Sequence, residues 1–239
     1  MKTNKIFSLF LLTPLLAIVL SACNGGVSQT ETREVSGFNA VAVSAVGELK
    51  IRQGDTESLV IEAPSNYLRY LETSVENNTL AISTRRGFIG LPAAKVIYTL
   101  TVKDLNSILL SGAGSIKILG DFKCNDLSLN MSGAGSVEID SLTADSLTVN
   151  FSSAGAIILA GRVDKQTVTI SGVGSYEAGD LQSNSTNIVL TGAGSAVVWV
   201  KETLNITVSG VGSISYFGNP RVTQNISGLG SVNSKGEHP

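Results

Sequence analysis

Ser132-Gly-Ala-Gly-Ser136 lies between two stretches of alternating apolar and polar residues, Leu127-Ser-Leu-Asn-Met131 and Val137-Glu-Ile139. An apolar side chain at every second position is typical of a half-buried β-strand. Six further forms of the motif begin at Ser111, Ser152, Ser171, Thr191, Ser209 and Ser227. Because repeats of about 20 residues are typical of solenoids, the sequence predicts an all-β fold. We expect a β-helix whose coils of roughly 20 residues stack about one strand spacing, ~4.8 Å, apart.

The glycines of the motif have three interpretations. A nucleotide or phosphate loop needs a third glycine or a following Lys-Ser/Thr, and no copy has either. Calcium-binding β-roll repeats need Gly-Gly-x-Gly-x-Asp and a shorter period. The pattern therefore favours a structural role, in which glycine permits a strained corner or a close approach between backbones.

The middle residue of each motif is small or apolar and never polar. Strict alternation through the motif would turn it outward and create an exposed apolar column, a candidate partner-binding surface. If the motif is instead a corner, a glycine breaks the alternation and the middle residue enters the core. The restriction to Ala, Val and Leu favours burial. We therefore predict that these residues are mostly buried: Ala113, Ala134, Ala154, Val173, Ala193, Val211 and Leu229.

Composition excludes several functions. The 239 residues carry a formal net charge of −2, so a basic face for nucleic acid is not expected. The single histidine, His238, is the second-last residue, which argues against a histidine-based metal site or catalytic triad. We predict no metal and no cofactor.

The N-terminus predicts export and lipid anchoring. Residues 1–22 have a basic start and an apolar stretch too short to span a bilayer, as in a signal peptide. They end in Leu20-Ser-Ala-Cys23, which resembles a bacterial lipobox and implies lipidation of Cys23. Asn24, where Asp would suggest retention at the inner membrane, favours the outer membrane. Residues 23–32 are polar and Gly-rich, as expected of a flexible tether.

The remaining chain forms one domain, residues 33–234, followed by a polar tail, 235–239, that is expected to leave the solenoid. Residues 105–234 hold the regular repeats, and residues 33–104 form an irregular section that covers the first coil. Within that section we expect the following elements: strands at Leu59–Glu62 and Val96–Val102, a helical turn in Asn66–Glu72, and a hairpin over Thr73–Thr84 that turns at Asn77-Asn78.

An enzyme is the alternative class, because polysaccharide lyases and hydrolases also use β-helices. Such an enzyme needs convergent carboxylates, or a basic residue beside a metal. Aspartates lie mostly between repeats, where turns favour them, and no acid–base cluster recurs in neighbouring coils. The candidates are Asp121, Asp126, Asp140, Asp145, Asp164 and Asp180.

Two further side chains are candidates for function. Trp199 is the only tryptophan, and alternation in Ala196–Val200 turns it outward, where it could contact a sugar or a protein partner. Packing against Val197 or a neighbouring coil is the favoured interpretation. Cys124 has no neighbouring histidine and is expected to be a small buried side chain rather than a reactive thiol.

Several segments together resemble the putative auto-transporter adhesin, head GIN domain family. These are Arg33-Glu-Val-Ser-Gly-Phe38, Ile51-Arg-Gln-Gly-Asp55, the Ser-Gly-x-Gly-Ser repeats and Tyr216-Phe-Gly-Asn-Pro220. The resemblance covers about residues 33–234. It implies a right-handed β-helix on a bacterial lipoprotein, an adhesive role, and no catalytic residues. In residues 152–156 Ser153 stands where other copies have glycine, which puts the corner of that coil in doubt.

We therefore expect a non-enzymatic, lipid-anchored β-solenoid that serves as an adhesin or a structural or binding protein of the cell envelope. Its partners would be the membrane, through Cys23, and an unknown envelope or surface ligand. A β-helix enzyme that acts on carbohydrate and a non-catalytic glycan-binding module remain alternatives.

Overall fold

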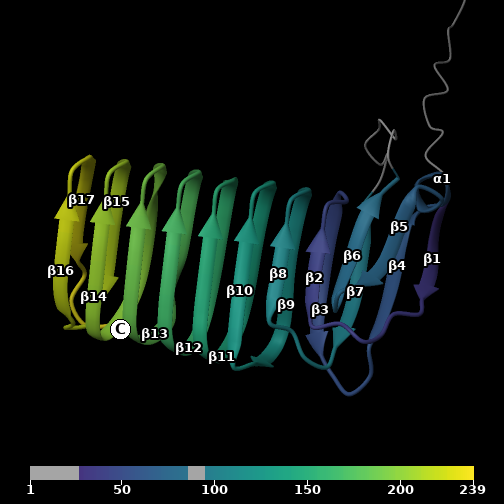
Figure 1. Ribbon diagram of the computed structural model, residues 1–239, viewed down its shortest axis with the longest axis horizontal. Coiled ribbons are helices and arrows are strands. Elements are labelled where there is room, and N and C mark those ends of the chain that lie inside the picture. Colours follow the sequence, from purple (N-terminus) through teal and green to yellow (C-terminus); the bar gives the residue numbers. More distant parts are fainter. Residues whose placement is uncertain (1–26, 86–94) are drawn as a thin grey trace, which may run out of the picture.

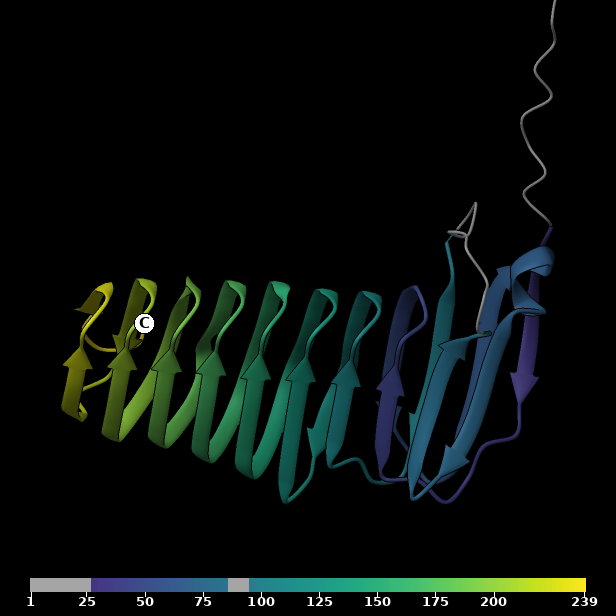
Figure 2. The same ribbon diagram turned by 45° about the horizontal axis from the view of Figure 1, so that its top comes forward.

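The computed structural model describes residues 27–85 and 95–239, and these residues form a β-solenoid (Figure 1). The coils stack side by side along the long axis of the molecule in both views (Figure 2). The predicted all-β fold with coils of about 20 residues is confirmed. The right-handed sense that the resemblance implied stays a prediction.

The regular part contains ten strands that wind through successive coils. They are β8 (Ser107–Leu110), β9 (Ala113–Lys123), β10 (Asp126–Met131), β11 (Ala134–Phe151), β12 (Ala154–Ile170), β13 (Val173–Leu190), β14 (Ala193–Val208), β15 (Val211–Phe217), β16 (Arg221–Ile226) and β17 (Leu229–Ser234).

Each coil has two legs that cross the flat faces of the solenoid. The first leg follows the Gly-x-Gly motif, and the second leg returns to the next motif. Strands β11 to β14 run through both legs, with a shift of register between the legs of β11 and β12 at Ile139/Leu142. All neighbouring coils in this part pair in parallel, so that Ala134 lies beside Ala154 and Phe151 beside Ile170.

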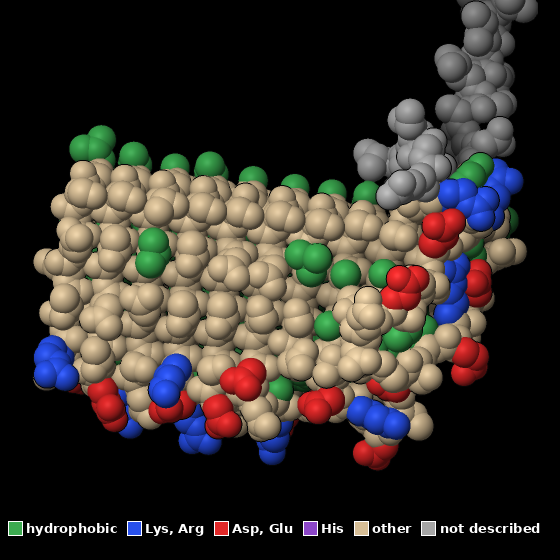
Figure 3. All heavy atoms as spheres, in the orientation of Figure 1, with side chains coloured by type: hydrophobic (Ala, Val, Ile, Leu, Met, Phe, Trp, Pro, Cys, Tyr) green, Lys and Arg blue, Asp and Glu red, His purple; other side chains and the backbone are tan. Residues whose placement is uncertain are grey.

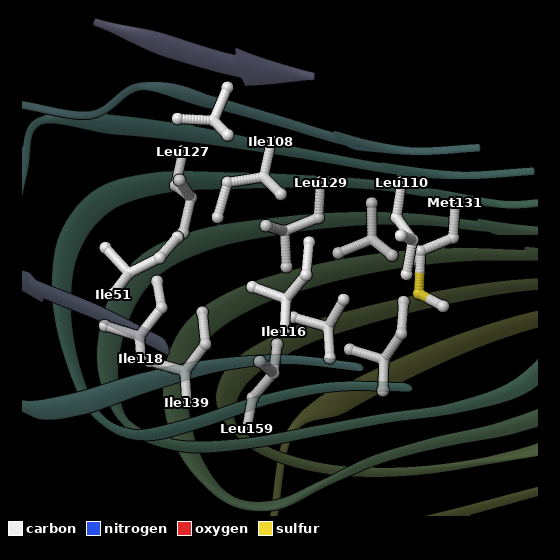
Figure 4. Packing of buried hydrophobic residues seen from close by; sticks show 14 of the residues in the cluster. Ile51, Ile108, Leu110, Ile116, Ile118, Leu127, Leu129, Met131, Ile139 and Leu159 are labelled. Atoms are coloured by element: carbon white, nitrogen blue, oxygen red, sulfur yellow. The ribbon is translucent and has the colours of Figure 1, made fainter. Parts of the chain in front are cut away.

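The core lies between the two legs. Alternate residues of each strand are buried, such as Val137 and Ile139 in β11, and both are at most 1% exposed. Figure 4 shows the first-leg residue Ile116 facing the second-leg residue Leu129. Burial of one such side chain contributes roughly 1.5–3 kcal/mol to stability. In a stack, each coil has its apolar side chains covered by the coils on both sides, whereas a single coil would leave them exposed.

The N-terminal section closes the first coil with antiparallel strands. Its elements are β1 (Ser28–Arg33), β2 (Ala40–Val43), β3 (Gly47–Gln53), β4 (Ser58–Pro64), α1 (Ser65–Leu68), β5 (Leu71–Glu76), β6 (Thr79–Thr84) and β7 (Ile97–Val102). Strand β4 pairs antiparallel with both β1 and β7. This pairing covers an end that would otherwise expose a row of free backbone groups.

Most local predictions for this section are confirmed. Strands β5 and β6 form the expected hairpin, and Asn77 and Asn78 both have positive φ, at 50° and 60°, as a tight hairpin turn requires. One boundary needs correction. The tether predicted over residues 23–32 overlaps β1, whose residues Ser28 to Arg33 pair with Leu59 to Pro64.

The glycines of the motif lie where the corners of successive coils touch. A side chain at Gly133 would overlap the carbonyl oxygen of Gly112 and come within 2.7 Å of the carbonyl carbon of Ser111. The backbone N–H groups of Gly133 and Ala134 donate to the preceding coil, to the carbonyls of Leu110 and Gly112 at 3.2 and 3.0 Å. Close approach between backbones is therefore what excludes side chains here.

Ser153, which replaces a motif glycine, keeps the register of its corner, but among the described residues Ser153 and Ala154 do not repeat the backbone hydrogen bonds that Gly133 and Ala134 make to the preceding coil. Ala154 and Gly155 keep the register with Ala134 and Gly135. The side chain of Ser153 is buried, and its Oγ has no hydrogen-bond partner among the described residues. The substitution therefore leaves a buried polar atom unsatisfied, but the path of the chain is retained.

Gly133→Val should destabilise the solenoid strongly, by about 3 kcal/mol or more, because its side chain cannot fit between two corners. The matched control is Ser132→Ala, which trims one exposed hydroxyl and should cost about 0.5 kcal/mol or less. Chemical unfolding followed by circular dichroism measures both. Equal losses of stability in the two variants would contradict the close approach of the corners.

Candidate partner-binding edge

The middle residues of the seven motifs form one exposed column along an edge of the solenoid. Val173, Val211 and Leu229 are 64%, 54% and 80% exposed, and the four alanines are exposed as well. The prediction that these residues are mostly buried is wrong. Figure 3 shows the column as a row of hydrophobic side chains along the upper edge. We call it the apolar edge; it consists of Ala113, Ala134, Ala154, Val173, Ala193, Val211 and Leu229.

The backbone explains this orientation. Each middle residue except Ala154, which follows Ser153, stands between two glycines whose backbones lie close to the preceding corner, so no space remains for a side chain to turn inward. Its N–H donates to the preceding coil, as in Val173 to Ser153 and Leu229 to Gly210, both at 3.0 Å. Strict alternation through both glycines correctly indicated that the middle residues point outward. The restriction of these positions to apolar residues favoured burial and was misleading.

Small hydroxyl side chains flank the apolar edge. The first residue of each motif is exposed, and several hydroxyls donate to the carbonyl of the coil before, such as Ser152 Oγ to Met131 at 3.1 Å. The flanking Ser and Thr side chains are short and uncharged, so they leave the middle residues accessible. The edge is therefore narrow, uncharged and increasingly apolar toward Leu229, which lies in the last coil.

Charged side chains gather along the opposite edge (Figure 3). Three of the aspartates considered for catalysis accept hydrogen bonds there from the residue one coil later. Asp121 accepts from Ser141 at 2.8 Å, Asp126 from Ser146, and Asp164 from Asn184 at 2.7 Å. These carboxylates link neighbouring coils at the turns, as the interpretation of turn aspartates expected.

A groove of about 480 Å³ opens on the first-leg face, and no local pattern of residues predicts it. Its rim carries carboxylates from two coils, those of β11 and β13, which are separated by the coil of β12. Lys117 contacts two of them, Glu138 at 2.7 Å and Asp140 at 3.6 Å. The lining residues are Glu138, Ile139, Asp140, Ile158, Leu159, Ala160, Glu177, Gly179, Asp180, Val197, Phe217, His238 and Pro239.

The charges around Lys117 stabilise its protonated form. The hydrogen bond to Glu138 is the main cause that raises the pKa of the Lys117 ammonium, and the charge of Asp140 adds to it. At this end of the groove, the positive charge of Lys117 therefore offsets the negative charges of Glu138 and Asp140. The carboxylates of Glu177 and Asp180 have no such lysine beside them among the ion pairs of the described residues.

Trp199 points outward, as alternation predicted, between the buried Val198 and Val200. The expected packing against Val197 or a neighbouring coil stays a prediction, and the structure adds a contact that was not expected. Its indole stacks on the imidazole of His238, with ring centroids 3.9 Å apart and an interplanar angle of 14°. The tail expected to leave the solenoid thus folds back over it, and His238 is the residue that sequence reasoning missed.

In residues 27–85 and 95–239, no three His, Cys, Asp or Glu side chains meet in a way that could hold a metal ion. No helix in this part of the chain has the length and apolarity needed to cross a bilayer. Cys23 and the predicted signal peptide, residues 1–22, lie outside the described residues.

Cys124 is half-buried rather than fully buried, and it packs against the core. Burial raises the pKa of its thiol to about 11, and the nearby charges of Asp104, Asp126 and Asp145 act in the same direction. Because the thiolate is the nucleophile, this thiol is poorly reactive near neutral pH. The expectation of an unreactive, packed side chain agrees with this environment.

The raised pKa predicts how Cys124 responds to pH. In a chain that carries Cys23→Ser, the rate of alkylation by iodoacetamide should rise about tenfold per pH unit until the pH approaches about 11. Free N-acetylcysteine, the control, should level off about two pH units lower. A rate for Cys124 that levels off below pH 9 would contradict the effect of burial.

Comparison with known proteins agrees with this fold. The model of the putative auto-transporter adhesin, head GIN domain, matches residues 37–220. A putative adhesin from Bacteroides fragilis NCTC 9343 is 28% identical, with a TM-score of 0.84 over 87% of this chain and 97% of that chain. A putative lipid binding protein from Parabacteroides distasonis ATCC 8503 is 25% identical, with a TM-score of 0.68 over 88% and 97%.

A putative adhesin from the same P. distasonis strain, at 23% identity and a TM-score of 0.70 over 87% of this chain and 97% of that chain, shares the fold. No curated protein matches the chain. The matching model spans most of the solenoid, from Gly37 before β2 to Pro220 before β16. The chain therefore belongs to the putative auto-transporter adhesin, head GIN domain family.

Proposed function

We propose that this protein is a non-enzymatic adhesin of the bacterial envelope, lipid-anchored at Cys23 in the outer membrane, that binds its partner along the apolar edge. The observation that carries the proposal is the exposure of Val173, Val211 and Leu229 in one straight column. Exposed apolar surface that repeats in register is characteristic of interaction sites. The family and the B. fragilis relative are named as putative adhesins, which supports a surface or envelope location.

The position of the anchor supports this function. Cys23 precedes β1, and β1 lies at the end of the solenoid opposite β17 (Figure 1). A lipid at Cys23 would therefore hold the N-terminal end near the membrane. Leu229, the most exposed large residue of the apolar edge, belongs to the coil farthest from the anchor. The most apolar part of the edge would then lie at the end of the solenoid far from the membrane, where a partner on another surface makes its first contact.

The size of the side chains suits many weak contacts. Full burial of one Val or Leu contributes roughly 1.5–3 kcal/mol, and the alanines contribute less. A partner that covers only one or two coils would bind weakly. Because the same atoms recur about every 4.8 Å along the edge, a long partner or several copies of the protein could engage many coils at once, and such multivalent contacts strengthen attachment.

A catalytic role receives less support. The turn aspartates Asp121, Asp126 and Asp164 are engaged in hydrogen bonds between coils. The structural relatives that share this fold at 25% identity or more are named as an adhesin and a lipid binding protein. An activity screen against polysaccharides tests this part, and cleavage of any of them would overturn the non-enzymatic assignment.

Cys23→Ser should abolish membrane attachment. Without the thiol no diacylglycerol can be added, so the chain should keep its signal peptide or appear in the soluble fraction. Cys124→Ser is the matched control and should fractionate with membranes like the wild type. Immunoblots of fractionated cells and the mass of the processed chain measure both. A Cys23→Ser chain that is processed and sediments like the wild type would refute the anchor.

Replacement of the far end of the apolar edge should weaken adhesion. The double variant Val211→Ser, Leu229→Ser removes two exposed apolar side chains and should leave stability within about 0.5 kcal/mol. We expect cells that display it to adhere at least about threefold less to a hydrophobic surface and to one another, since contact energy falls with buried apolar area. Leu109→Ser is the control, because Leu109 is 40% exposed but lies outside the edge. Equal adhesion by the wild type, the double variant and Leu109→Ser would exclude the apolar edge as the adhesive surface. Protease shaving of intact cells tests whether the protein is displayed on the cell surface.

A further inference from the structure

The groove on the first-leg face combines an apolar floor with hydrogen-bond acceptors. Ile158 is 46% exposed in its floor, and Val197 and Phe217 are half-buried beside it. Gly179 leaves room for these side chains, because a Cβ there would come within 3.2 Å of Val197 and 3.4 Å of Phe217. The rim carries four carboxylates that are spread around it: Glu138, Asp140, Glu177 and Asp180.

A planar ring already occupies one end of this groove. The imidazole of His238 lies flat on Trp199, at 3.9 Å and 14°, and meets the ring of Phe217 edge-on, at 5.3 Å and 69°. Its Nε2 is 3.2 Å from Oδ1 of Asp180. The protein thus holds a flat ring by its face, and it binds a polar atom at the edge of that ring through a carboxylate.

The tail that delivers this ring is held by few contacts. Backbone hydrogen bonds join Lys235 to Tyr216 and Gly218 to Gly236, both at 2.8 Å. Beyond Gly236, the described contacts with the solenoid are those of the His238 side chain. Its carboxylate partner, Asp180, has a side chain that is 81% exposed. Exposed ion pairs contribute little, and the His238 side chain is 21% exposed, so its stack on Trp199 is the contact that a ligand would have to replace.

We propose that Trp199, Phe217, Asp180 and the adjoining groove form a glycan-binding subsite, which the imidazole of His238 fills when no ligand is present. The apolar C–H face of a sugar ring would replace the imidazole on the indole. Its hydroxyl groups would donate to Asp180 and, farther along, to Glu177, since ionised carboxylates only accept hydrogen bonds. The apolar floor at Ile158 and Val197 would receive the next sugar of the chain.

A glycan fits this surface better than the basic side chain of a protein. A lysine or arginine would be attracted by Glu177 and Asp180, but Lys117 already compensates Glu138 and Asp140, and the ammonium of Lys235 already lies 5.4 Å from the centroid of the Phe217 ring. The flat aromatic platform and several separate acceptors match a ring with hydroxyl groups around it. The subsite lies on a face and not on the apolar edge, so its failure in experiment would leave the adhesion proposal untouched.

The single tryptophan allows a direct test on the full-length mature protein. Linear hexasaccharides of glucose, mannose and N-acetylglucosamine are the probes, and Trp199 emission and titration calorimetry are the measurements. His238→Ala should bind at least one probe about fivefold or more tightly than the wild type, because removal of an internal competitor raises the available fraction of the site. Glu237→Ala, which alters the same tail but not the stacked ring, should bind like the wild type.

Two substitutions at the platform complete the test. On the His238→Ala background, Trp199→Ala should lose binding at least tenfold by calorimetry, whereas Trp199→Phe, which keeps an aromatic face, should retain part of it. Circular dichroism checks that both variants fold. The proposal is wrong if none of the three probes binds to His238→Ala, or if Trp199→Ala binds equally well. It is also wrong if polylysine binds at Trp199 and the hexasaccharides do not, which would assign the groove to a basic protein segment.

Discussion

The close approach of backbones at the glycine corners is the constraint on which the rest of the molecule depends. Gly133 lies against Gly112, and the same contact recurs between later coils, as at Gly192 and Gly172. This contact holds the corners at one strand spacing, so the legs on both sides can pair without a break. It also leaves the middle residue of every motif only one direction in which to project. A structural requirement for glycine thus produces an exposed apolar edge as its consequence.

The solenoid itself could be predicted from sequence because its determinants are local and repeated. Alternation in Leu127–Met131 and Val137–Ile139 predicts strands, and the recurrence of the motif predicts stacking. The hairpin at Asn77-Asn78 is equally local, since only the turn needs positive φ. In each of these cases the residue types and their spacing are sufficient to determine the local structure.

The candidate sites depend on contacts that spacing does not encode. The orientation of Val211 and Leu229 follows from backbone contact with the coil before, which composition alone does not reveal. His238 reaches Trp199 and Asp180 across 39 and 58 positions of sequence, so no pattern near Trp199 predicts its partner. The strand at Ser28–Arg33 was missed for a similar reason, because its polar residues are ordered by pairing with β4 at the end of the solenoid.

The parallel register between coils has a consequence for how such a protein can change in length. The strands β11 to β14 pair with their neighbours in parallel, and the residues of the motif corners stay in register from coil to coil while the shifts between the legs differ. Duplication of one unit of about 20 residues would therefore insert a complete coil without a new kind of interface. The molecule would grow by about 4.8 Å, with both of its ends unchanged. The number of repeats would then set the distance between the N-terminal end and the last coil, and gain or loss of a repeat during evolution would change that distance.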